Sequence, residues 1–142
     1  MRIALTELEM TLLSGFNIWR YINDDINKEE LKEVVTILIN TTKKDDPLYN
    51  LLLIAEAVLN NTLMKHITDI LLMEEAPNSA NYRTASKLII NHSQNPYGDK
   101  ALLKALYTQI IALSHHQTNG NEALIIEAME SIETIQERLC HA

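Results

Sequence analysis

The sequence predicts an all-α fold of about seven short helices, arranged as a single domain over residues 1–142. Apolar residues recur at every third or fourth position along nearly the whole chain, which is the spacing of amphipathic helices. The chain has only 3 Gly and 3 Pro, and 5% of its residues are aromatic, so its composition favours helices over strands and hairpins. A chain of 142 residues can bury about 70% of its unfolded surface, so it needs no disulfide or metal to fold.

The first two predicted helices are defined by different signals. The first, over about residues 5–23, carries one apolar stripe, which we assign to the core: Leu5, Leu8, Leu12, Phe16 and Trp19. The second follows Asn27, which is a favourable N-cap residue, and Glu30 stands three residues later, as a capping box requires.

The third predicted helix has the clearest start and end. Asp46 is a capping acid, and Pro47 directly after it fits the first helical position, where its missing N–H is no loss. Asn60 and Asn61 are expected to end this helix, because asparagine tolerates the left-handed backbone that terminates helices.

Polar breaks divide the rest of the chain into four further helices. Thr62 and Ser79 are the expected N-caps of the fourth and fifth helices, and Asp99 is expected to cap the sixth. The loop "HHQTNGN" separates the sixth helix from the seventh, which spans about residues 121–139.

One nine-residue pattern occurs three times. "LKEVVTILI" begins at Leu31, "MKHITDILL" at Met64 and "LKALYTQII" at Leu103. Each copy begins a helix that a second helix follows, and helix pairs at such intervals are typical of stacked helical repeats. The chain then divides into three helix pairs, with the first helix as an N-terminal cap: about residues 28–61, 62–93 and 99–139.

This arrangement resembles a short HEAT or armadillo-type repeat array. The resemblance implies a curved stack in which each helix pair shields the apolar face of the next. The alternative is an irregular helical bundle, because amphipathic helices share the same core spacing in any fold. Both architectures remain open from the sequence alone.

Charge and composition narrow the class of partner. The formal net charge is −7, with 19 acidic against 12 basic residues, so nucleic acid and anionic membranes are poor partners and a basic protein is a better one. Cys140 is the only cysteine, which excludes an internal disulfide and fits a reducing compartment. The N-terminus lacks the pattern of a signal peptide and no apolar run reaches the length of a membrane span, so we expect a cytoplasmic protein.

The sequence contains no pattern that predicts catalysis, and we expect neither an enzyme nor a bound cofactor or metal. The five histidines form no zinc-binding spacing, and the three glycines are scattered rather than gathered in a phosphate-binding loop. His115 and His116 are expected in the last turn of the sixth helix, where the helix dipole alone favours them.

The seventh predicted helix carries the strongest functional signal. One face is apolar and is expected to pack on the core: Leu124, Ile125, Ala128, Met129, Ile132 and Ile135. The opposite face carries four acids that we predict to bind a partner: Glu127, Glu130, Glu133 and Glu137. Like charges spaced by three or four residues repel one another, so this strip costs stability unless a cation meets it. A solvated face of an ordinary amphipathic helix is the alternative interpretation.

Three further residues are predicted to bind the partner. Glu74 and Glu75 lie at a predicted helix end, where the helix dipole disfavours acids. Tyr97 lies in the loop "HSQNPYGD", and loops carry binding residues more often than cores do.

Size, charge and the absence of catalytic patterns together indicate a protein-binding module. Small acidic helical proteins of this kind resemble bacterial immunity proteins and antitoxin-like inhibitors. The resemblance implies that an acidic surface neutralises a basic toxin, for example a nuclease, by imitating the phosphate chain of its substrate. The alternative is an adaptor or regulatory subunit of a larger protein assembly.

Overall fold

The computed structural model describes residues 5–63, 87, 90 and 98–141. Every regular element in this part of the chain is an α-helix, which confirms the all-α prediction. The helices are α1 (Glu7–Ile22), α2 (Lys28–Thr41), α3 (Pro47–Leu59), α6 (Asp99–Gln117) and α7 (Glu122–His141). The fourth and fifth predicted helices lie almost entirely outside the described residues. None of the described helices is long and apolar enough to cross a membrane.

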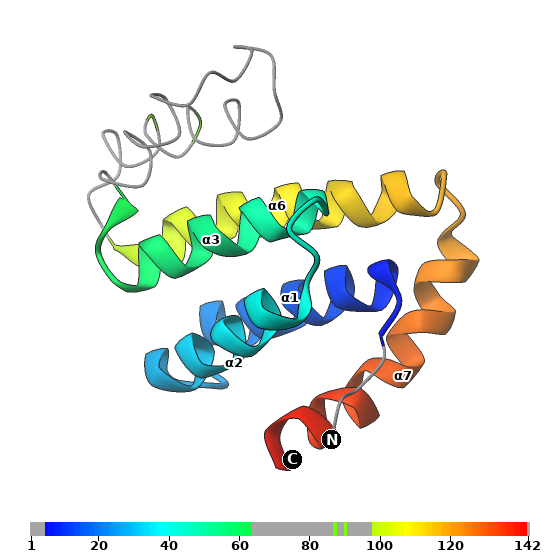
Figure 1. The fold of residues 1–142 in the computed structure, drawn as a ribbon, viewed down its shortest axis with the longest axis horizontal. Coiled ribbons are helices and arrows are strands. Elements are labelled where there is room, and N and C mark those ends of the chain that lie inside the picture. Colours follow the sequence, from blue (N-terminus) through cyan, green and yellow to red (C-terminus); the bar gives the residue numbers. More distant parts are fainter. Residues whose placement is uncertain (1–4, 64–86, 88–89, 91–97, 142) are drawn as a thin grey trace.

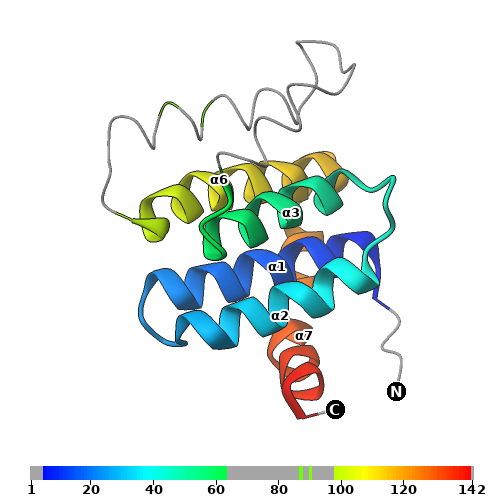
Figure 2. The ribbon, with the colours of Figure 1, turned by 60° about the vertical axis from the view of Figure 1, so that its left-hand side comes forward.

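Four of the helices form a closed ring. α1 packs against α2 and α6, and α3 completes the ring because it packs against the same two helices. Neighbouring helices in the ring run in opposite directions, with α1 and α2 in one layer and α3 and α6 in the other (Figure 1). α7 lies outside the ring, against α1, and runs across it rather than alongside it (Figure 2).

This arrangement does not support the stack of helix pairs. In a linear stack, an N-terminal cap contacts only the first pair, and the ends of the array stay apart. Here α1 instead contacts α2, α6 and α7, so the first helix lies at the centre of the described fold. The described helices therefore have the alternative architecture, an irregular helical bundle. The lysine shared by the three copies of the pattern has no shared role, because Lys32 pairs with Glu29 whereas Lys104 is exposed without an ion pair among the described residues.

The predicted helix starts at Asn27 and Asp46 are confirmed. Asn27 and Glu30 form a reciprocal capping box, with N···O distances of 2.8 and 3.2 Å. The Asp46 carboxylate accepts a hydrogen bond of 2.9 Å from the backbone N–H of Leu48. α3 ends before Asn60, and Asn61 has the expected left-handed backbone, with φ of 58°.

The predicted cap at Asp99 is wrong. Gly98 occupies the N-cap position, with φ of 93°, and makes no side-chain cap. Asp99 is the first residue of α6, and its carboxylate points to α1 and α2, where it meets Tyr21 and Lys28. An acid in the first helical turn still stabilises the positive end of the helix dipole.

The apolar stripe predicted on α1 is not its most buried side. Trp19 is 45% exposed, and only Leu12 among the five stripe residues is buried. The deepest side chains include Leu13 and Ile18 together with three polar ones. Because three helices surround α1, burial extends over most of its circumference and no longer follows the apolar stripe.

The buried polar side chains of α1 donate hydrogen bonds to their own helix, whereas the Oδ1 oxygen of Asn17 is buried without a hydrogen-bond partner among the described residues. Thr11, Ser14 and Asn17 each donate a side-chain hydrogen bond to the carbonyl four residues earlier, at 2.9, 2.8 and 2.9 Å. Such bonds remove the penalty of burying a lone donor. These short side chains also leave room for the neighbouring helices.

α1 and α6 come close together at Gly15. A Cβ atom at this position would lie 3.4 Å from Cγ2 of Ile110 and 3.5 Å from the ring of Tyr107. A methyl group fits at these distances, whereas a longer side chain would force the helices apart.

We therefore expect opposite effects from two substitutions of Gly15. Gly15→Ala should leave stability unchanged or raise it by up to about 1 kcal/mol, because alanine favours the helix. Gly15→Leu should lower stability by about 1–3 kcal/mol, because the extra atoms overpack the interface. Urea unfolding of both variants measures the difference, and a leucine variant as stable as the alanine variant would contradict this packing.

Candidate functional site

α7 is attached to the bundle by its carboxyl-terminal half. Ile132 and Ile135 are buried in one apolar cluster with side chains of three ring helices, among them Met10, Leu13, Leu38 and Leu52. Burial of two isoleucines contributes about 1.5–3 kcal/mol each to holding the helix in place. The rest of the helix is held much less, because residues 122–130 are exposed apart from the half-buried Ile125 and Ala128.

A buried polar contact fixes the position of α7 on α1. The Asn17 amide nitrogen donates a 2.8 Å hydrogen bond to the Gln136 side-chain oxygen, and both residues are buried. Asn17 is missing from the sequence prediction because a single amide in a helix carries no pattern. Gln136 lies beside the apolar positions of α7 and gave no signal either. Because each buried amide needs its partner, the contact favours one register of α7 over all others.

The four predicted acids of α7 all lie in solvent. Glu127, Glu130, Glu133 and Glu137 are exposed. Within the described part of the chain, none of these carboxylates forms an ion pair, and the exposed Arg138 forms none with them. The helix therefore presents a line of negative charge that no cation among the described residues compensates.

The apolar residues of α7 divide differently from the prediction. Leu124 and Met129, which were assigned to the core face, are 45% and 42% exposed. Ile126 was not singled out from the sequence, and it is 59% exposed. The buried part of the core face is therefore limited to the second half of the helix, whereas Ile125 and Ala128 in the first half are only partly buried against the same cluster.

The other three predicted binding residues, Tyr97, Glu74 and Glu75, lie outside the residues that the structure describes. Trp19 was predicted to be a core residue, but its exposed ring lies against the half-buried Tyr107, with 5.2 Å between ring centroids. This aromatic pair belongs to α1 and α6.

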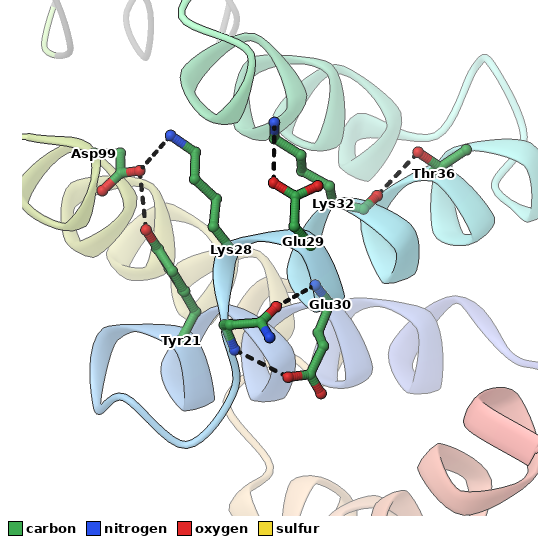
Figure 3. A network of polar contacts seen from close by, with 8 residues as sticks. Tyr21, Lys28, Glu29, Glu30, Lys32, Thr36 and Asp99 are labelled. Carbon is green, nitrogen blue, oxygen red and sulfur yellow. Dashed lines mark hydrogen bonds and ion pairs between the residues drawn. The ribbon is translucent and has the colours of Figure 1, made fainter.

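A second polar cluster joins α1, α2 and α6 at one end of the ring (Figure 3). The Tyr21 hydroxyl donates a 3.0 Å hydrogen bond to Oδ2 of Asp99, and the Lys28 ammonium lies 3.1 Å from the same oxygen. Lys100, the next residue on α6, forms an ion pair with Asp24 and lies 5.3 Å from the Tyr21 ring centroid.

The contacts of this cluster support a structural role. Burial, together with the hydrogen bond and the negative charge of Asp99, raises the pKa of Tyr21 from 10.0 to about 12. A tyrosine that holds its proton more tightly than usual is a poor acid and a poor nucleophile at neutral pH. The cluster ties three helices together through one carboxylate.

No metal site is found among the described residues, because no three potential ligands lie together there. His115 and His116 lie exposed in the last turn of α6, as predicted. Their position fits the favourable interaction of histidine with the carboxyl-terminal end of a helix.

Comparison with known proteins identifies no relative. No family model matches the sequence, and neither a curated protein nor a solved structure gives a significant match. The class of protein is therefore inferred from the exposed surface of α7 and from the fold that carries it.

The raised pKa of Tyr21 predicts a loss of stability at alkaline pH. The folded state favours the protonated phenol, so this contribution is complete below about pH 10 and is lost as the pH rises from about 10 to 12. Tyr21→Phe should lower stability by about 1–2 kcal/mol at neutral pH, because the bond to a carboxylate is lost. It should also flatten the decline between pH 10 and 12. Thermal unfolding at several pH values compares the two proteins, and parallel profiles would contradict the assignment.

The contact between Asn17 and Gln136 predicts a measurable coupling. Asn17→Leu or Gln136→Leu alone should cost about 1–3 kcal/mol, because each removes the buried hydrogen bond that joins the two amides. The double variant should be more stable than the sum of the single effects predicts, since it removes both polar groups. Urea unfolding of the three variants gives the coupling, and purely additive losses would show that the two side chains act independently.

Proposed function

We propose that this chain is a protein-binding module whose acidic helix α7 binds a basic protein. The observation that carries the proposal is the line of four exposed glutamates without ion pairs in the described part of the chain. Glutamates spaced in this way repel one another by a few tenths of a kcal/mol per pair. A basic partner would relieve that repulsion on binding, and it would be attracted over a distance of about 10 Å at moderate salt.

The specific form of the proposal is an inhibitor of the immunity or antitoxin type. A basic toxin such as a nuclease has a surface that receives the phosphate chain of its substrate. A helix with a line of carboxylates would imitate that phosphate chain by presenting negative charges in a row. The net charge of −7 supports a basic partner and disfavours nucleic acid itself. The same proposal places the protein in the reducing environment of the cytoplasm.

A second candidate function rests on a different surface. The exposed Trp19 on α1 lies against the half-buried Tyr107 on α6, and exposed aromatic residues are common anchors of protein interfaces. A partner held there by apolar contacts would make the chain an adaptor or regulatory subunit. The salt dependence of partner binding distinguishes the two functions. Association driven by charge slows as salt is added, whereas binding through apolar contacts responds little.

The test is affinity capture of the tagged protein from its native cells, washed at low and then at high salt. We expect a basic protein that is retained at low salt and released at high salt. The triple variant Glu127→Gln, Glu130→Gln, Glu133→Gln should slow its association by about tenfold or more.

A matched control removes the same number of charges from other helices and loops. Glu7, Glu33 and Asp45 are all exposed, and the variant Glu7→Gln, Glu33→Gln, Asp45→Asn changes the net charge equally. Equal losses in both variants would mean that only net charge matters. A captured partner that tolerates the α7 variant but not Trp19→Ala would favour the adaptor function.

A further inference from the structure

We propose that the first half of α7 binds a basic amphipathic helix, through apolar contacts set among the glutamates. This inference rests on the proposed function, because it names the kind of segment that the basic partner presents to α7. On this view, α7 recognises its partner through apolar contacts as well as through charge.

In the part of the chain that the structure describes, half of the exposed large apolar residues lie on this segment. Among the described residues, six large apolar side chains are exposed, and three of them lie within residues 124–129. Single exposed apolar residues are ordinary on a protein surface, but a group on one short helical segment indicates a contact surface.

Ile126 and Met129 lie on the acidic side of the helix. They are three residues apart, so they are neighbours on one face. Glu122 and Glu130 are each four residues from Ile126, and Glu133 is four residues from Met129. The surface is therefore a pair of apolar side chains bordered by carboxylates at both ends. Leu124 lies on the other flank of the helix.

The chemistry of this surface selects its occupant. A second copy of the chain is disfavoured, because it would bring the same glutamates against each other. A purely basic segment would leave Ile126 and Met129 against water or against charged groups. A basic helix with apolar residues three or four positions apart matches both the apolar pair and the acids around it. Its apolar side chains contact Ile126 and Met129, and its lysines or arginines reach the surrounding carboxylates.

The test uses the full chain and two labelled synthetic peptides, each about five helical turns long and made of the same lysines and leucines. One peptide places its leucines on one helical face, and the other has the same residues in an order without an apolar face. Fluorescence anisotropy measures the binding of each peptide. We expect the amphipathic peptide to bind about tenfold more tightly or better, because it buries additional apolar surface.

The variant Ile126→Gln, Met129→Gln should lose this preference. Ile37→Gln serves as the control, because Ile37 is also an exposed isoleucine, at 37%, on another helix. The control should keep the preference. Circular dichroism and thermal unfolding of both variants verify that the fold is retained.

The outcomes separate this inference from the proposed function. If both peptides bind equally well and the Ile126 and Met129 variant binds them as the unmodified chain does, the inference is overturned. If the triple glutamate variant nevertheless weakens the binding of both peptides, the proposed electrostatic interface still stands. A triple glutamate variant that binds as tightly as the unmodified chain overturns the proposed function, whichever peptide is preferred. Binding of neither peptide also overturns the inference.

Discussion

The enclosure of α1 is the constraint on which the rest of the described structure depends. A helix that is surrounded by three others must be buried on most of its circumference, yet its neighbours must still come close. The sequence of α1 meets both needs with small side chains at Thr11, Ser14 and Gly15. The two polar ones bond to the preceding turn of their own helix, so burying them leaves no lone donor. The close approach of α6 at Gly15 then closes the ring, and the outer side of α1 remains for α7.

Local features of the sequence were predicted well, and the reason is that they depend on neighbouring residues only. The capping box at Asn27 and the Asp46–Pro47 start are completed within one helical turn. The cap predicted at Asp99 is wrong because aspartate, although it favours a cap position, here binds residues from distant parts of the chain instead. The positive φ of Gly98 starts α6, and the carboxylate is free to bind Tyr21 and Lys28.

Tertiary features were predicted less well, because periodicity shows which face of a helix is apolar but not what covers it. The stripe that includes Trp19 is the more apolar side of α1, yet the ring closes over another side. In α7 the line of glutamates could be read from spacing, whereas the point along the helix where burial stops depends on the length of the helices beneath it. Met129 was therefore assigned to the core although it is exposed. A repeated helical pattern likewise shows which faces are apolar but not which helices cover them, so it does not show whether the helices form a stack or a closed ring.

The contacts that close the bundle join residues that are very far apart in the chain. The bond between Asn17 and Gln136 spans 119 positions, and that between Tyr21 and Asp99 spans 78. A helical protein with such distant contacts has a higher contact order than a simple sequence of helical hairpins, which slows folding. During synthesis, α1 leaves the ribosome before the other described helices but obtains the contact with α7 only when α7 has been made. The groups of α1 that face α7 therefore remain open to other contacts throughout the synthesis of the residues between these two helices.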